Sequence, residues 1–185
     1  MWTKAKSLIT DDFLSSEDLA LFRTLAENWE SPPPKMRHML RTGASDTIDI
    51  EQYCHKYKPK LLEIYKELTG QVGSRYNASL CWTLTGQGYE HKPHVDASHK
   101  MLSTVVYIYP DNETGTYYDE DESVGWHSPQ AEWKVNRAFS FSATPDVTWH
   151  RFRSISEKRV TLNFHLTIQP TDPRKMKDQF RKSYT

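Results

Sequence analysis

The chain has 185 residues and a mass of 21.7 kDa, the size of one ordinary domain with a sizeable core. Its 24 Lys and Arg residues balance its 24 Asp and Glu residues, which excludes a protein that captures nucleic acid by bulk charge. Leu, Ile, Val and Phe together number only 36, against 6 Trp, 10 Tyr and 7 Phe, so we expect a core of aromatic rings on β-sheets.

Two helices are predicted in the first third of the chain. A Ser-Ser-Glu-Asp start and an apolar stripe at helical spacing predict a helix near 16–29, which Pro32–Pro34 end. A second helix is expected from Asp49 to Leu68, with Gly70 as its C-cap. Pro59 either kinks this helix or restarts it.

After residue 75 the hydrophobic period changes from 3.6 to 2. Apolar and polar residues alternate over 76–85, and 102–109 is rich in β-branched and aromatic residues, so both are predicted strands. The clearest strand is 159–168, where apolar and polar residues also alternate. Shorter candidates lie at 116–118, 131–135, 138–142 and 147–152.

Two helices followed by about eight strands predict an α+β protein, or a mainly β barrel with helical buttresses. We expect a single domain over 1–185, with helical support over 1–70, a β core over 75–168 and a tail over 171–185. The apolar side of the last strand should pack against the helices. Its other side either faces solvent or, in a closed barrel, lines a ligand cavity. That side carries Arg159, Thr161, Asn163 and His165.

The candidate metal ligands begin with His94 and Asp96. On an extended segment, side chains at i and i+2 point to the same side and can bind one ion. His150 follows Asp96 by 54 residues, inside a predicted strand. Two imidazoles and one carboxylate form the facial triad of non-haem Fe(II) oxygenases, which leaves positions open for a chelating co-substrate and O2. His91, at an odd offset from His94, is expected on the opposite face.

Arg159 follows His150 by 9 residues, and Thr161 lies two further on. A guanidinium with a hydroxyl is a good receptor for the far carboxylate of a dicarboxylate. The ordered set of these motifs resembles the 2-oxoglutarate/Fe(II)-dependent dioxygenases, and most of all their prolyl-4-hydroxylase-like branch. The resemblance covers roughly 75–168. The turn at 86–89 before the first ligand also resembles that branch, whereas Thr114-Gly115 replaces its usual Gly-Gly.

The resemblance implies a double-stranded β-helix (jelly roll) with supporting helices and a shared reaction. By this resemblance, Fe(II) would be held by His94, Asp96 and His150, and 2-oxoglutarate would chelate it. With O2 the co-substrate would become succinate and CO2 while a C–H bond of the substrate is oxidised. Related halogenases lack the carboxylate, so the presence of Asp96 implies hydroxylation.

The same resemblance assigns the remaining site residues. The co-substrate carboxylate would be bound by Arg159, Thr161 and Tyr107. Asn163, His165 and Thr83 would line the pocket, and no catalytic residue is expected beyond the metal and co-substrate ligands.

Several alternatives stay open. The substrate is a prolyl residue in a protein or peptide, or a small metabolite, because the fold alone does not choose. A jelly-roll module that binds a sugar or peptide without turnover is the competing function, although it does not need a carboxylate receptor. A zinc hydrolase with the same ligands would leave that receptor idle. Arg151 and Arg153 could bind an anionic substrate or lie outside.

We expect a cytoplasmic protein with neither a membrane nor a nucleic-acid partner. No apolar run approaches the roughly 20 residues that span a bilayer, and residues 1–13 lack a signal-peptide core. Two cysteines, Cys54 and Cys81, cannot form a disulfide scaffold, which favours a reducing compartment. The sequence leaves the oligomeric state open.

Overall fold

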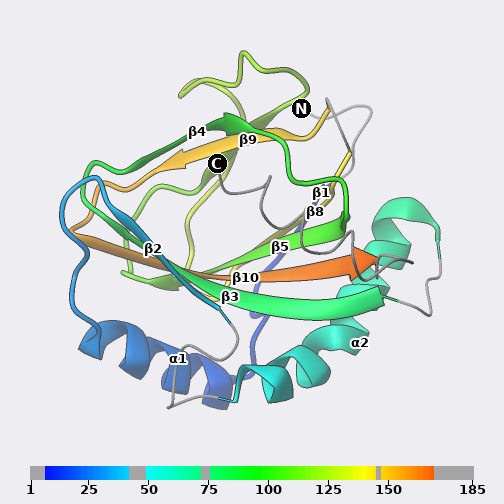
Figure 1. The fold of residues 1–185 in the computed structure, drawn as a ribbon, viewed down its shortest axis with the longest axis horizontal. Helices are drawn as coiled ribbons and strands as arrows, with labels where there is room; N and C mark the ends of the chain where they lie inside the picture. Colours follow the sequence, from blue (N-terminus) through cyan, green and yellow to red (C-terminus); the bar gives the residue numbers. More distant parts are fainter. Residues whose placement is uncertain (1–6, 42–48, 72–75, 145–146, 169–185) are drawn as a thin grey trace, which may run out of the picture.

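Two antiparallel sheets face each other, and two helices cover the outer side of the larger sheet (Figure 1). The computed structural model describes residues 7–41, 49–71, 76–144 and 147–168. The larger sheet contains β1 (Ser7–Thr10), β2 (Arg37–Arg41), β3 (Tyr76–Gly86), β5 (Lys100–Tyr109), β8 (Ala138–Ser142) and β10 (Lys158–Ile168), in the order β1-β8-β5-β10-β3-β2. The smaller sheet contains β4 (Glu90–His94), β6 (Thr116–Asp119), β7 (Gln130–Ala131) and β9 (Trp149–Arg153), in the order β4-β9-β6-β7.

Both predicted helices are present and are capped as the sequence indicates. Helix α1 (Ser16–Asn28) begins after Ser15, whose hydroxyl accepts a hydrogen bond from the Asp18 N–H at 3.2 Å. Helix α2 (Ile50–Thr69) ends at Gly70, which has a left-handed φ of 73°. Pro59 lies inside α2, which continues through it, so the proline does not restart the helix. No helix in the described ranges is long and apolar enough to cross a membrane.

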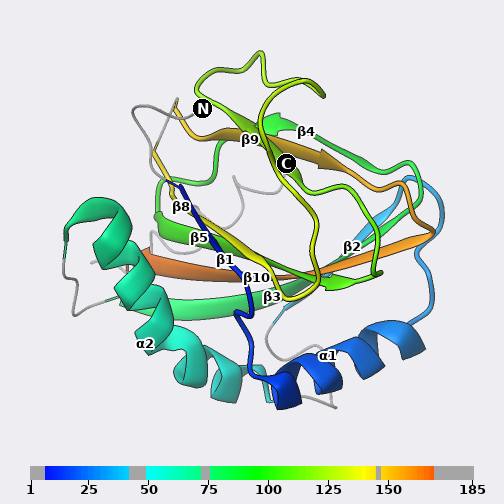
Figure 2. The same ribbon diagram turned by 180° about the vertical axis from the view of Figure 1, so that it is seen from behind.

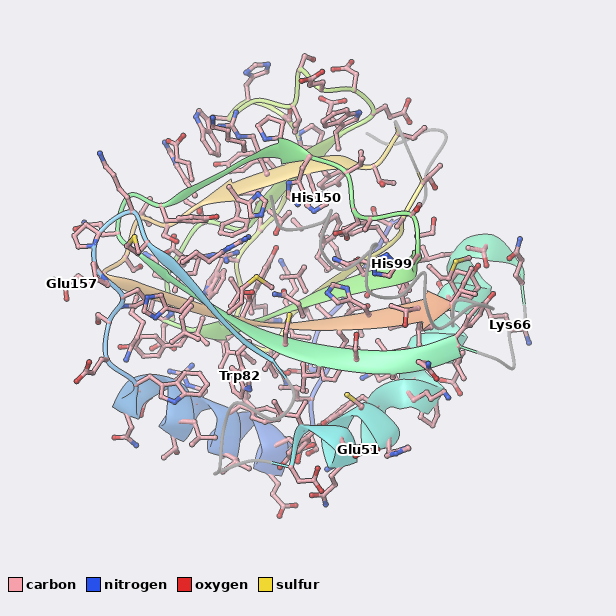
Figure 3. All side chains as sticks on the ribbon, viewed as in Figure 1. Glu51, Lys66, Trp82, His99, His150 and Glu157 are labelled. Atoms are coloured by element: carbon pink, nitrogen blue, oxygen red, sulfur yellow. The ribbon has the colours of Figure 1, made fainter. Side chains whose placement is uncertain are left out.

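The main core lies between the larger sheet and the helices, which are on the same side of that sheet in both views (Figures 1 and 2). The ring of Phe164 on β10 lies 5.8 Å from that of Phe13 and 5.5 Å from that of Tyr57, centroid to centroid. Trp82 of β3 points toward α1 (Figure 3) and meets Phe22 edge-on at 5.1 Å. The predicted aromatic core, with the apolar side of the last strand against the helices, is therefore confirmed.

Three strands lie where the sequence predicted none. Strands β1 and β2 fall in the region predicted as helical support, so residues 1–70 are not wholly helical. Both are short, with too few residues to show a clear alternation. Strand β4 contains Pro93, which masks its extended character. The predicted tail, 171–185, lies outside the described residues.

Gly115, the second residue of the Thr114-Gly115 motif, is required there for a steric reason. A Cβ at Gly115 would lie 1.7 Å from the carbonyl oxygen of Ala131, on the neighbouring strand β7. No side chain fits at that distance, so only glycine lets the chain enter β6 here. Thr114 instead uses its hydroxyl to donate a hydrogen bond to the carbonyl of Arg153.

Candidate metal centre

A cleft of about 620 Å³, open solvent included, lies between the two sheets. The polar side of β10 lines this cleft, so it faces a cavity and not bulk solvent. The strand register places polar side chains of neighbouring strands on the same face of the sheet. Thr161 is opposite Thr83, and His165 is opposite Ser103. The lining residues are Arg37, Met39, Cys81, Thr83, His91, His94, Asp96, Lys100, Ser103, Val105, Thr116, Phe141, His150, Phe152, Arg159, Thr161, Asn163 and His165.

The three predicted metal ligands meet in the cleft. His94 ends β4 and is paired with His150 on β9, and their ring centroids lie 4.1 Å apart. Asp96 follows two residues later, and one ligand atom from each of the three residues lies within 4.8 Å of the other two. Figure 3 shows His150 between the two sheets. This spacing suits one ion bound by two imidazoles and a carboxylate.

Backbone carbonyls orient both imidazoles. The Nδ1 of His94 lies 2.9 Å from the carbonyl oxygen of Lys92, and the Nδ1 of His150 lies 3.0 Å from that of Thr148. A carbonyl only accepts, so each Nδ1 carries the proton and each Nε2 keeps its lone pair. Such a hydrogen bond on the far nitrogen is the usual arrangement for a metal-binding histidine.

The carboxylate of Asp96 is held at both oxygens. Lys100 donates to Oδ1 at 2.7 Å, and the Ser103 hydroxyl donates to Oδ2. Because the Ser103 hydroxyl donates its proton to Asp96, its oxygen must accept a hydrogen bond from the Nδ1 of His165, which lies 3.2 Å away. His165, predicted as pocket lining, is thus the start of a hydrogen-bonded chain that ends on a candidate ligand.

All three candidate ligands are in their metal-binding protonation states at neutral pH. Burial, aided by His150 and His91, lowers the pKa of His94 to about 2, and burial also lowers the pKa of His150. Burial alone would raise the pKa of Asp96, but the charge of Lys100 and its hydrogen bond, together with the nearby imidazoles of His150 and His165, outweigh it, and this pKa lies well below its ordinary value. Neutral imidazoles and an ionised carboxylate are the forms that bind a metal.

The prediction for His91 is wrong. Its ring stacks on that of His94 with 3.9 Å between centroids, and it lines the cleft. The cause is a register shift in β4 between His91 and His94, which breaks the strict alternation of a strand. Burial first, and the charge of Arg37 second, lower the pKa of His91 to about 4, so this imidazole is neutral.

Arg159 is a buried cation at one end of the cleft. It is 1% exposed, and its Nε and Nη2 have no hydrogen-bond partner in the described part of the chain. Its Cζ lies 4.2 Å from the ring centroid of Phe152 and 5.0 Å from that of Trp133. Burial lowers its pKa to about 10, so the guanidinium stays charged at neutral pH. A buried charge with idle donors is costly unless an anion joins it.

The other predicted co-substrate residues lie beside Arg159. Thr161 is buried and lines the cleft. Tyr107 is buried opposite Thr161, with its ring centroid 6.0 Å from the Cζ of Arg159, but it is absent from the cleft lining. Its hydroxyl lies 3.1 Å from the Thr116 hydroxyl and 3.0 Å from the Ala131 carbonyl, so it also ties strands together.

Arg151 and Arg153 lie outside the cleft. The Cζ of Arg151 is 3.5 Å from the ring centroid of Trp126, and that of Arg153 is 4.9 Å from it. Neither residue lines the cavity. The sequence left open whether these arginines bind an anionic substrate or lie outside, and the structure places them outside.

Sequence reasoning missed several residues of the cleft. Arg37 and Met39 come from β2, an edge strand that the sequence did not reveal. Ser103 lies in the predicted strand 102–109 and Lys100 lies two residues before it, and both follow Asp96 closely in the sequence. Phe152, two residues after His150, shares its face by strand alternation.

The sequence matches no protein-family model, and it has no match among curated proteins. Solved structures nevertheless share its fold. A prolyl-4-hydroxylase from Pseudomonas putida has a TM-score of 0.66 at 11% identity, covering 90% of this chain and 95% of that one. A prolyl hydroxylase from Trichoplax adhaerens, in complex with a peptide fragment of the hypoxia inducible factor oxygen degradation domain, has a TM-score of 0.62 at 10% identity, covering 97% and 87%.

A third structure is HygX from Streptomyces hygroscopicus with nickel and 2-oxoglutarate bound. Its TM-score is 0.62 at 9% identity, and the match covers 91% of this chain and 85% of that one. Because these matches span most of each chain, they confirm the predicted double-stranded β-helix with supporting helices.

Proposed function

We propose that this protein is an Fe(II)- and 2-oxoglutarate-dependent dioxygenase that hydroxylates its substrate. The observation that carries the proposal is the pairing of two features in one cleft. His94, Asp96 and His150 converge within metal-binding distance, and Arg159 supplies a buried cation with idle donors. A carbohydrate- or peptide-binding module has no use for this combination.

The donor set fits Fe(II). Two Nε2 atoms and one carboxylate suit a divalent first-row metal and leave coordination positions open. The protein prepares these ligands by fixing both imidazole tautomers through Lys92 and Thr148 and by holding Asp96 between Lys100 and Ser103. An ion would therefore meet ligands that need little rearrangement.

The pocket around Arg159 fits the far carboxylate of 2-oxoglutarate. The guanidinium offers two nitrogens without hydrogen-bond partners in the described part of the chain, Nε and Nη2, and the rings of Phe152 and Trp133 exclude water around it. Thr161 adds a hydroxyl, and Tyr107 supports the wall behind the guanidinium. Such a bidentate, charge-assisted contact orients a dicarboxylate as well as binding it.

When bound, iron, 2-oxoglutarate and O2 would supply an oxidation that yields succinate and CO2 and hydroxylates a C–H bond. The substrate is a peptide, such as the Trichoplax prolyl hydroxylase binds, or a small molecule. A cytoplasmic location is part of the proposal, and Cys54 and Cys81, which form no disulfide, are consistent with it.

The test is spectroscopic. Anaerobic addition of Fe(II) and 2-oxoglutarate to the wild-type protein should produce the weak visible charge-transfer band of the chelate. His94→Ala should abolish this band, because it removes one of three metal ligands. In air, the wild type should form succinate when its substrate is present.

His55→Ala is the matched control, because His55 is an exposed histidine on α2 that does not line the cleft. It should keep the wild-type band. A wild-type protein without the band, or a His94→Ala variant that retains it, contradicts the proposed function.

A further inference from the structure

A second cation, Arg37, lines the cleft apart from Arg159. Both residues are opposite Thr85 in the sheet register, Arg37 on β2 and Arg159 on β10. They therefore lie in one row on the same face, with β3 between them. Two strand spacings separate their Cα atoms by roughly 9.6 Å.

Arg37 lies near His91, and both residues line the cleft. Its Cζ is 5.8 Å from the ring centroid of Tyr89, which meets His91 edge-on at 6.2 Å. His91 in turn stacks on the candidate ligand His94. The guanidinium is thus connected by a short chain of contacts to the candidate metal ligand His94, and no ion pair of Arg37 with an acid is found among the described residues.

Formal charge in the cleft also favours an anion. Three cations line it, Arg37, Lys100 and Arg159, against one carboxylate, Asp96. The charges of Fe(II) and 2-oxoglutarate cancel, so a surplus of two positive charges remains after both are bound. The whole chain has a net charge of zero, so this positive charge is a local property of the cleft.

We propose that the substrate is a small acid whose carboxylate or phosphate binds Arg37, next to the apolar side chain of Met39. The inference rests on the proposed function. An arginine fork binds either oxyanion with paired hydrogen bonds. Met39 is two residues along β2 on the same face, and it offers the carbon skeleton an apolar contact. The oxidised carbon would then be close to the charged group.

The experiment uses the anaerobic Fe(II)·2-oxoglutarate complex and two panels of probes. One panel pairs carboxylic acids with their amides, and the other pairs phosphate monoesters with their parent alcohols. At least one charged member should shift the charge-transfer band and, in air, stimulate succinate formation, while its neutral partner should not. The panel that responds identifies which oxyanion is used.

Arg37→Gln should weaken binding of the responding acid about 10- to 100-fold, because it removes a charge-assisted contact. Its affinity for 2-oxoglutarate should stay at the wild-type value, and Arg37→Lys should recover part of the loss. Lys35→Gln is the matched control, because Lys35 is an exposed cation two residues away that does not line the cleft.

Three results would overturn the inference while leaving the proposed function intact. These are neutral probes that bind as well as their charged partners, panels in which no acid shifts the band, and an Arg37→Gln variant with unchanged affinity for the responding acid. Absence of the band itself would instead remove the proposed function and this inference together.

Discussion

In the proposed function, Arg159 costs the fold stability and provides the binding site for the co-substrate carboxylate. It buries a charged group against aromatic rings and leaves two of its donors unused. Removing a buried, uncompensated charge in favour of an apolar side chain of similar length is often neutral or stabilising. The effects of a substitution on stability and on co-substrate affinity should therefore have opposite signs at this position.

Arg159→Met tests this at the level of one residue. The dissociation constant for 2-oxoglutarate should rise at least about tenfold, because charge-assisted hydrogen bonds contribute roughly 1.5–3 kcal/mol. The melting temperature without ligands should not fall. Anaerobic titration of the charge-transfer band and thermal unfolding measure the two quantities.

Arg153→Met is the control, because Arg153 stacks on Trp126 outside the cleft. Its affinity for 2-oxoglutarate should match the wild type. If Arg159→Met binds 2-oxoglutarate normally, the assignment of Arg159 as the carboxylate receptor is wrong. If the variant melts well below the wild type, the buried charge of Arg159 does not destabilise the fold.

At the scale of secondary-structure elements, the sequence predicts best where local signals are strong. Both helices, and β3, β5, β8 and β10, lie within one or two residues of their predicted bounds because capping residues and long alternation define them. The predicted strand at 131–135 shrinks to Gln130–Ala131, since a loop follows. Strands β1 and β2 are short edge strands that form through pairing with distant partners, which no local pattern reports.

In the candidate site, too, the residues placed by local sequence signals were predicted, and those placed by pairing between distant strands were not. His94, Asp96, His150 and Arg159 lie together in the cleft as their spacing predicted, because strand alternation fixes their faces. His91 was misplaced because the irregularity of β4 depends on its pairing with β9. Arg37 was missed because its role depends on where an edge strand docks.

Lys158 links two elements that are far apart in sequence. It is a buried residue at the start of β10, and its Nζ donates to the carbonyl oxygens of Glu27 at 3.0 Å and Trp29 at 2.7 Å. Helix α1 has no basic residue in its own last turn. The lysine therefore supplies the positive charge that favours a helix C-terminus from a neighbouring strand.

Lys158→Met should lower the free energy of unfolding by about 2–4 kcal/mol, because two charge-assisted hydrogen bonds are lost and two carbonyls are left unpaired. Urea denaturation measures this. Lys66→Met, at an exposed lysine of α2 (Figure 3), should change stability by less than about 0.5 kcal/mol. Equal effects of the two substitutions would show that Lys158 is not a cap for α1.

For the whole molecule, balanced charge makes acid stability depend on specific ionised groups. The net charge is zero near neutrality, so acidification neutralises carboxylates and leaves Lys, Arg and His charges to repel one another. Asp18 is one of these groups. It is 4% exposed, accepts a hydrogen bond from the Lys56 Nζ at 2.7 Å and another from the Tyr57 hydroxyl, and so joins α1 to α2.

Burial alone would raise the pKa of Asp18, but the hydrogen bonds from Lys56 and Tyr57 outweigh it, and the pKa lies below its ordinary value. Because the folded-state pKa is below the unfolded-state value of about 3.9, the ionised carboxylate stabilises the fold above that value. This contribution is lost as the pH falls through the lowered pKa.

Asp18→Asn should therefore lower the free energy of unfolding at pH 7, by about 1.5–3 kcal/mol, and flatten its decline below about pH 5. Urea denaturation over a pH series measures both effects. Lys56→Met removes the partner charge, and the double variant should lose less than the sum of the two single losses, because both remove one interaction. Parallel pH profiles for Asp18→Asn and the wild type, or fully additive losses, would show that this pair does not set the acid stability of the protein.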